Sequence, residues 1–116
     1  MPESIIQRKT FAFALLVIRL YQRLKQQREY VISQQLLRCG TSIGANVEEA
    51  TAAQSRKDFL AKMAIASKEA RETRYWLRLL QESNLAAIDV TEEMNNVEEI
   101  IRILTSIVKT TSKSGE

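Results

Sequence analysis

The sequence predicts an all-α protein, an antiparallel up-down-up-down four-helix bundle that forms a single domain over residues 1–116. Hydrophobic residues make up 45% of the chain, with only three glycines and one proline, which favours helices over a turn-rich β architecture. Apolar residues recur at alternating steps of three and four in four segments, as expected for helices facing a bundle core. The segments are joined by short connections, so consecutive helices should run antiparallel.

The first two helices are expected over residues 4–26 and 29–53, separated by a polar turn that begins at Lys25. In the first helix the core-facing positions are Ile6, Thr10, Phe13, Val17, Leu20 and Leu24. In the second helix the same spacing selects Ile32, Leu36, Cys39, Ile43, Asn46 and Ala50.

The third and fourth helices are expected over residues 56–83 and 90–111. Ser55 and Asp89 are typical N-terminal capping residues, and Asn84 is a typical residue after a helix end. Core-facing positions in the third helix are Phe59, Met63, Ala66, Ala70, Thr73, Leu77 and Leu80. Those in the fourth helix are Met94, Val97, Ile101, Leu104 and Val108.

The stretch RCGTSIGANVEEA, residues 38–50, contains several poor helix formers. Gly40 and Gly44 would allow a neighbouring helix to approach closely, although each costs about 1 kcal/mol relative to alanine. A polar stripe lies beside the apolar one and consists of Gln35, Arg38, Ser42, Asn46 and Glu49. We interpret this stripe as a structural hydrogen-bonded set, with a polar functional site as the alternative.

Enzymatic activity is not expected, and no catalytic residue, cofactor or metal ligand set is predicted. The chain has no histidine, and Cys39 is its one cysteine, so the common general base and the common metal ligands are missing. A carboxylate metal site from Glu49, Glu69 and Glu72 is conceivable, but the Glu-x-x-His pairs of di-iron bundles are absent.

A cytoplasmic protein that does not enter the membrane is expected. The apolar run from Phe11 to Ile18 is too short to span a bilayer, and no small-residue cleavage site follows it.

Positive charge is concentrated near the beginning of the chain, whose net charge is +3 overall. Residues 1–38 carry seven lysines and arginines against two glutamates, whereas the start of the fourth helix is acidic. Two arginine stripes at helical spacing are candidate nucleic-acid contacts: Arg8, Arg19 and Arg23, and Arg71, Arg74 and Arg78. Alternatively, these arginines form a solvated face or pair with acids, including those of the fourth helix.

Three helices have more apolar residues than one core-facing seam requires. Because large exposed apolar patches are unusual in soluble monomers, we expect a homo-oligomer. The candidate interface residues are Ile18, Tyr21, Trp76, Leu79, Ile103 and Ile107. Tyr21, Tyr75 and Trp76 are expected to pack, which leaves few platforms for bases and argues against sequence-specific recognition of nucleic acid.

Four stretches together resemble the bacterial four-helix bundle family whose genes include those in 23S rRNA intervening sequences. They are QLLR from Gln35, TSIGANVEEA from Thr41, SRKDF from Ser55 and KEARETRYWL from Lys68. A related branch is similar to the accessory protein of diversity-generating retroelements, which works with a reverse transcriptase and binds nucleic acid. The resemblance implies a homopentameric barrel. Ala50 stands where the family motif often ends in glycine, and a frequent proline near Gln27 is absent.

The leading functional hypothesis is a non-enzymatic oligomeric protein that binds RNA, or a ribonucleoprotein such as a ribosomal component, through its basic surface. The alternative is an interaction scaffold that docks a partner enzyme such as a reverse transcriptase. Salt distinguishes the two hypotheses, because phosphate binding weakens steeply with salt and apolar docking hardly responds.

Overall fold

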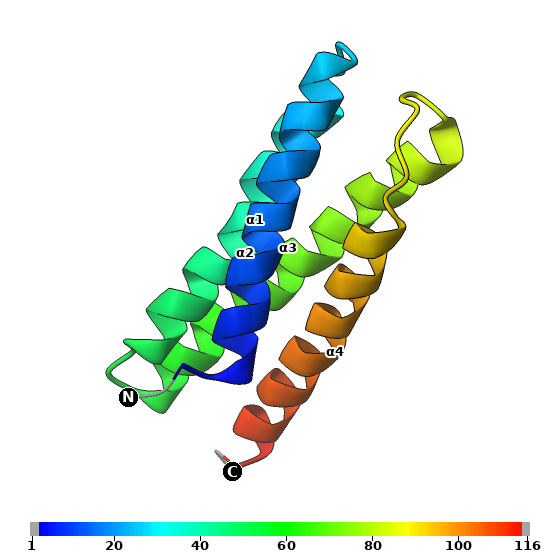
Figure 1. The fold of residues 1–116 in the computed structure, drawn as a ribbon. Coiled ribbons are helices and arrows are strands. Elements are labelled where there is room, and N and C mark those ends of the chain that lie inside the picture. The colour runs from blue at the N-terminus through cyan, green and yellow to red at the C-terminus, as the bar shows by residue number, and fades with distance from the viewer. Residues whose placement is uncertain (1–2, 115–116) are drawn as a thin grey trace.

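The computed structural model describes residues 3–114 and contains four helices: α1 (Ile5–Gln26), α2 (Ile32–Thr51), α3 (Arg56–Ser83) and α4 (Thr91–Ser114). Each helix packs against its neighbours in the chain, and α4 returns to α1, so the helices form a closed four-membered ring (Figure 1). Consecutive helices run in opposite directions, and no strand occurs among the described residues. The all-α four-helix architecture is therefore confirmed. The bundle is elongated, with extents of 48 × 25 × 20 Å.

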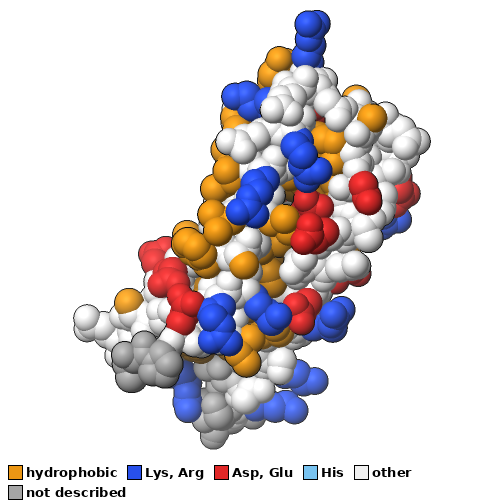
Figure 2. Space-filling view, viewed as in Figure 1, with side chains coloured by type: hydrophobic (Ala, Val, Ile, Leu, Met, Phe, Trp, Pro, Cys, Tyr) orange, Lys and Arg blue, Asp and Glu red, His pale blue; other side chains and the backbone are white. Residues whose placement is uncertain are grey.

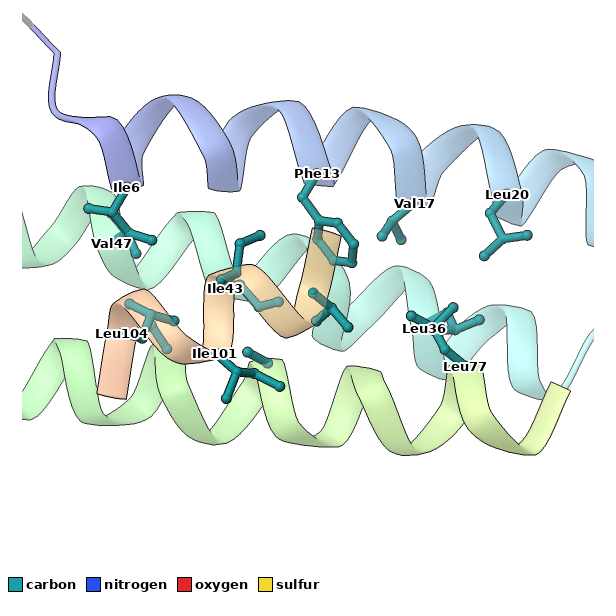
Figure 3. Close-up of a cluster of buried hydrophobic side chains, with 14 of the residues drawn as sticks. Ile6, Phe13, Val17, Leu20, Leu36, Ile43, Val47, Leu77, Ile101 and Leu104 are labelled. Atoms are coloured by element: carbon teal, nitrogen blue, oxygen red, sulfur yellow. The ribbon is translucent and has the colours of Figure 1, made fainter. Parts of the chain in front are cut away.

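The core runs along the bundle axis and receives side chains from all four helices (Figure 3). In α1 the buried residues are the six expected from spacing alone: Ile6, Thr10, Phe13, Val17, Leu20 and Leu24. In α3 the expected positions are buried from Met63 to Leu80, and Phe59 is half-buried. Thr10 and Thr73 fit in the apolar interior because each hydroxyl donates to a carbonyl one turn earlier, on Ile6 and Glu69.

The core-facing face of α2 differs from the expected one near its C-terminal end. Val47 is completely buried, whereas Asn46, expected on the seam, is half-buried. The face continues from Ile43 by a step of four to Val47 rather than by a step of three to Asn46. A branched apolar side chain gains from burial, whereas an amide would need hydrogen-bond partners in the core.

The helix expected to begin near residue 29 begins at Ile32, because Glu29 serves as its cap. One Glu29 carboxylate oxygen accepts from the backbone N–H groups of Val31 and Ile32, both at 3.0 Å, and the other accepts from Ser33 at 2.7 Å. The carboxylate thus satisfies three free N–H donors and lies at the positive end of the helix dipole. The helix ends at Thr51, two residues before the expected limit of 53.

The expected bounds of α4, 90–111, also shift. Asp89 accepts a hydrogen bond from the backbone N–H of Thr91 at 2.9 Å, which places the helix start at Thr91. The hydroxyl of Thr91 donates to the same carboxylate oxygen, and this bond together with the backbone one lowers the pKa of the Asp89 carboxyl. At the other end the helix continues to Ser114, since no glycine or proline occurs between residues 91 and 114. Residues 115–116 lie outside the described residues.

The two helical glycines lie on the side of α2 that faces α1. A Cβ atom at Gly40 would lie 2.8 and 2.9 Å from the two methyl carbons of Val17, and one at Gly44 would lie 3.3 Å from the carbonyl oxygen of Thr10. Because Val17 is completely buried, its methyl groups have little room to move aside. The close approach of α1 and α2 therefore requires the missing side chain at Gly40.

We predict that Gly40→Ala destabilises the protein by about 1–3 kcal/mol, because overpacking against Val17 outweighs the better helix propensity of alanine. Urea denaturation followed by circular dichroism measures the effect. In the double variant Gly40→Ala/Val17→Ala the two changes should cost less than their separate sum, since the clash is then absent. Stabilisation by Gly40→Ala would show that α1 and α2 are not in tight contact here.

Removal of the Glu29 cap should also destabilise the fold. Glu29→Ala leaves three backbone donors without their acceptor and is expected to cost about 1–2 kcal/mol in the free energy of unfolding. Glu29→Gln retains one acceptor oxygen, so its cost should be smaller. Equal stability of the alanine variant and the unaltered protein in chemical denaturation would contradict this role.

Candidate nucleic-acid interface

The arginine stripe of α1 is partly neutralised by α4. Arg23 forms an ion pair with Glu93 at 2.9 Å, and the Glu93 side chain is only 2% exposed. One turn from the other end, Lys9 pairs with Glu99 at 3.0 Å. Basic and acidic side chains accordingly lie next to one another along the front of the molecule (Figure 2). Arg8 and Arg19 are exposed, and Arg8 donates to the carbonyl of Glu3 at 3.1 Å.

The arginines of α3 have a different setting, because all three line one surface hollow between α3 and α4. The hollow has a volume of about 490 Å³. Its lining comes from one stretch of α3 and from the first turns of α4: Arg71, Arg74, Tyr75, Arg78, Gln81, Glu82, Met94 and Glu98. The structure thus brings Arg71, Arg74 and Arg78 together, as their helical spacing predicted.

A second hollow of about 480 Å³ continues along the same helix pair and shares Arg71 with the first. It adds Lys109 and Lys113 from the last turns of α4. We call the two hollows together the α3–α4 basic groove, whose cationic residues are Arg71, Arg74, Arg78, Lys109 and Lys113. From Ser67 to Glu82 the groove follows α3 for roughly 22 Å, at 1.5 Å per residue.

Sequence analysis missed Lys109 and Lys113. Their spacing of four residues places them on one face of α4, but only the packing of α4 against α3 shows that this face borders the arginines. An antiparallel pairing of the two helices brings the end of α4 beside the beginning of α3 and so extends the basic surface beyond Arg71.

The contacts that the groove cations make with neighbouring side chains are weak. Arg71 donates to the hydroxyl of Thr105 at 3.1 Å. Arg78 donates to Glu82 at 2.7 Å, and this hydrogen bond and charge raise the pKa of the arginine. Both partners are exposed, so water screens these contacts and they contribute little to stability. A phosphate group can therefore replace Glu82 at Arg78 without disturbing the fold.

Tyr75 lies in the groove rather than in the core, which corrects the expectation that it packs. Its side chain is 57% exposed and lines the hollow beside the three arginines. Trp76 is half-buried against the core, as expected, and meets Tyr75 in a T-shaped contact with ring centroids 5.3 Å apart. Tyr21 is half-buried beneath Lys25, whose ammonium lies 5.0 Å from the ring centroid.

The polar stripe of α2 makes several separate contacts rather than one site. Arg38 donates to the side-chain oxygen of Gln35 on its own helix, with a shortest distance of 3.0 Å, and forms ion pairs with Glu72 and Glu69 of α3. Desolvation acts to lower the pKa of Arg38, but the hydrogen bond and charge of Glu72 raise it overall. Glu72 also accepts from the indole N–H of Trp76 at 3.1 Å.

The rest of the stripe does not join this network. Asn46 donates to the carbonyl and hydroxyl oxygens of Ser42, at 2.9 and 3.1 Å, on its own helix. Glu49 pairs with Lys62 of α3 at 3.4 Å. Of the carboxylates considered for a metal, Glu69 and Glu72 face Arg38 and Glu49 faces Lys62. These contacts support the structural interpretation.

Cys39 lies in the core next to this network. Burial raises the pKa of its thiol, and Thr73 is its hydrogen-bond neighbour. The thiol is consequently held in its less reactive, protonated form.

The candidate interface residues divide into two groups. Trp76, Ile103 and Ile107 are partly buried against the core of the same chain, and Tyr21 and Leu79 are half-buried. Ile18 is 38% exposed and lies on one face of α1 with Phe11 and Leu15, which are 63% and 40% exposed. Phe11 and Leu15 were not among the interface residues predicted from sequence. Orange side chains line this edge of the molecule in Figure 2.

The exposed face of α1 borders a hollow of about 220 Å³ between α1 and α2. Phe11, Ala14, Gly44 and Ala45 contribute to its lining. Within residues 3–114 no helix is apolar enough over a sufficient length to cross a membrane.

Comparison with known proteins identifies a family and a similar solved structure. The model of the 23S rRNA-intervening sequence protein family matches residues 3–106. A crystal structure of a protein of unknown function from the S23 ribosomal protein family of Bacteroides thetaiotaomicron VPI-5482 is 44% identical, with a TM-score of 0.83. The alignment covers 90% of this chain and 99% of that one. No curated protein matches the sequence.

Proposed function

Because the chain belongs to the 23S rRNA-intervening sequence protein family, we propose that it is a non-enzymatic cytoplasmic protein that binds RNA through the α3–α4 basic groove. The membership predicted from sequence motifs is confirmed by the family match. The family and its solved relative carry no assigned activity, and neither description names an enzyme. Those descriptions refer to ribosomal RNA and ribosomal proteins, which favours RNA as the polymer.

The observation that supports this proposal is the convergence of five cations on one continuous groove. Arg71 belongs to both hollows and connects Arg74 and Arg78 on one side with Lys109 and Lys113 on the other. Glu82 and Glu98 are the acids that line the same hollows, so positive charge dominates the groove. A row of cations along a helix pair matches the row of phosphates along a nucleic-acid backbone.

The α1 stripe is a poorer candidate. Arg23 is engaged by a buried glutamate, and its release would leave Glu93 without a partner in a nearly closed environment. Phosphate contacts alone carry no sequence information, so the groove should bind RNA with little sequence preference.

Assembly of several copies would strengthen such binding. The exposed apolar face of Phe11, Leu15 and Ile18 suits contact with a second copy, and the family resemblance implies five copies in a barrel. Repetition of the groove around an oligomer multiplies weak phosphate contacts into useful avidity.

The same apolar face supports a second candidate function, the docking of a protein partner such as a reverse transcriptase or a ribosomal component. Exposed aromatic and aliphatic side chains on one helix are typical of protein contacts. Binding through this face would be nearly independent of salt, whereas groove binding would weaken with salt.

We predict that Arg71→Gln/Arg74→Gln/Arg78→Gln greatly weakens binding of a labelled single-stranded RNA, measured by fluorescence anisotropy. The plot of log affinity against log salt concentration should lose about 2 in slope, since each lost contact with a single strand contributes about 0.7. Glu82→Gln should have the opposite effect and tighten binding, because it removes a competitor for Arg78.

A charge-matched control is Arg28→Gln/Arg56→Gln/Lys57→Gln, which removes three exposed cations outside the groove. It should retain nearly the salt slope of the unaltered protein. If both triple variants weaken binding equally, net charge rather than the groove is responsible, and the proposed site is wrong.

Oligomerisation is tested separately by light scattering of the purified protein. Phe11→Glu/Leu15→Glu should convert the oligomer into smaller species, because two charges would be placed on the apolar face. Val31→Glu, at a 72% exposed residue outside this face, serves as the control and should leave the molar mass unchanged. A monomeric unaltered protein at micromolar concentration would exclude this part of the proposal.

A further inference from the structure

We propose that the α3–α4 basic groove takes single-stranded rather than double-stranded nucleic acid, and that Tyr75 stacks on one unpaired base. This inference rests on the proposed function and specifies its substrate class. It comes from the position, exposure and support of one aromatic side chain among the groove cations.

Tyr75 occupies a central place in the basic surface. Its ring lines the arginine hollow and also an adjoining hollow of about 210 Å³ formed with Arg78, Leu79 and Glu82. Arg71 precedes it by four residues and Arg78 follows it by three, so both arginines lie one helical turn away on the same side of α3. A base on the ring would therefore have cations on both sides for the phosphates that flank it.

The ring has a face available for stacking. In a T-shaped pair one ring presents its edge and the other its face, so the contact with Trp76, at an interplanar angle of 71°, occupies at most one face of Tyr75. The cation–π contact found within residues 3–114 is that of Lys25 with Tyr21, at the far end of α1, and not one with Tyr75. With 57% of the side chain exposed, a base can reach the other face.

The Tyr75 ring is also supported by its neighbour Trp76, which is itself anchored. Trp76 packs against the core, and its indole N–H donates to Glu72 at 3.1 Å. Glu72 is in turn paired with Arg38 of α2, so the support of Tyr75 extends across two helices. A platform that is already fixed loses little conformational freedom when a ligand stacks on it.

A groove that binds through stacking on Tyr75 should favour single-stranded over double-stranded nucleic acid. In a double helix the base faces are stacked on one another, so a surface tyrosine cannot reach them without unstacking the helix at a cost of a few kcal/mol. An unpaired base carries no such cost, and stacking on an aromatic side chain is worth about 1–3 kcal/mol. Cations with an interleaved aromatic ring are the arrangement found where proteins bind single strands.

The experiment compares Tyr75→Ala with Tyr30→Ala, which removes a tyrosine of similar exposure, 55%, that does not line the groove. Each variant is titrated with a labelled single-stranded RNA oligomer and with the matching duplex. Tyr75→Ala should lower affinity for the single strand roughly 5- to 150-fold, leave the salt slope unchanged, and alter duplex binding little. Tyr75→Phe keeps the ring and should restore most of the lost affinity.

Two results would overturn the proposal. In one, Tyr75→Ala binds the single strand as tightly as Tyr30→Ala does; in the other, the unaltered protein prefers the duplex. If the triple arginine variant still loses binding in either case, the groove remains a phosphate site and only the stacking role fails. If the unaltered protein binds neither RNA at low salt, the proposed function fails as well. Thermal melting of each variant, followed by circular dichroism, verifies that all are folded.

Discussion

Ion pairs between α1 and α4 join the first and last helices of the bundle and engage two of its cations, Lys9 and Arg23. These two helices have the least extensive contact of the four neighbouring pairs, and Lys9 with Glu99 and Arg23 with Glu93 bridge them. At one end Gln27 adds two hydrogen bonds to the backbone of Ala87, at 2.8 and 3.1 Å. The basic start of the chain is thus partly balanced by acidic residues of α4, whereas Arg8 and Arg19 of α1 stay exposed.

The opposite side of the bundle is organised by close packing of α1 against α2 together with charged contacts of α2. Gly40 allows α2 to approach Val17 of α1, and the Glu29 carboxylate fixes the first turn of α2. From α2, Arg38 reaches the glutamates of α3. α3 is therefore held on one side by core packing and on another by this ion-pair network, which leaves its third side, with Arg71 and Tyr75, directed to solvent.

The proposed binding surface requires no histidine, metal cluster or phosphate loop. Backbone binding of nucleic acid requires only fixed cations at helical spacing and a ring that a base can reach. Both requirements are met by ordinary side chains of α3 and α4 on a scaffold whose other residues serve packing.

The sequence by itself determined the four helices, most of their ends and nearly all of the core, because burial at steps of three and four is a local property of each helix. It also determined that Arg71, Arg74 and Arg78 share a face. The contact by which Glu29 caps α2 is also local, within two to four residues, but helical spacing did not predict it. Only tertiary structure decided that Val47 rather than Asn46 would be buried, and that Arg23 would be neutralised by Glu93. The addition of Lys109 and Lys113 to the arginines and the exposure of Tyr75 depend on how α4 is placed beside α3. Contacts between residues more than thirty positions apart depend on how whole helices pack against one another. The spacing of residues within a single helix does not specify that packing.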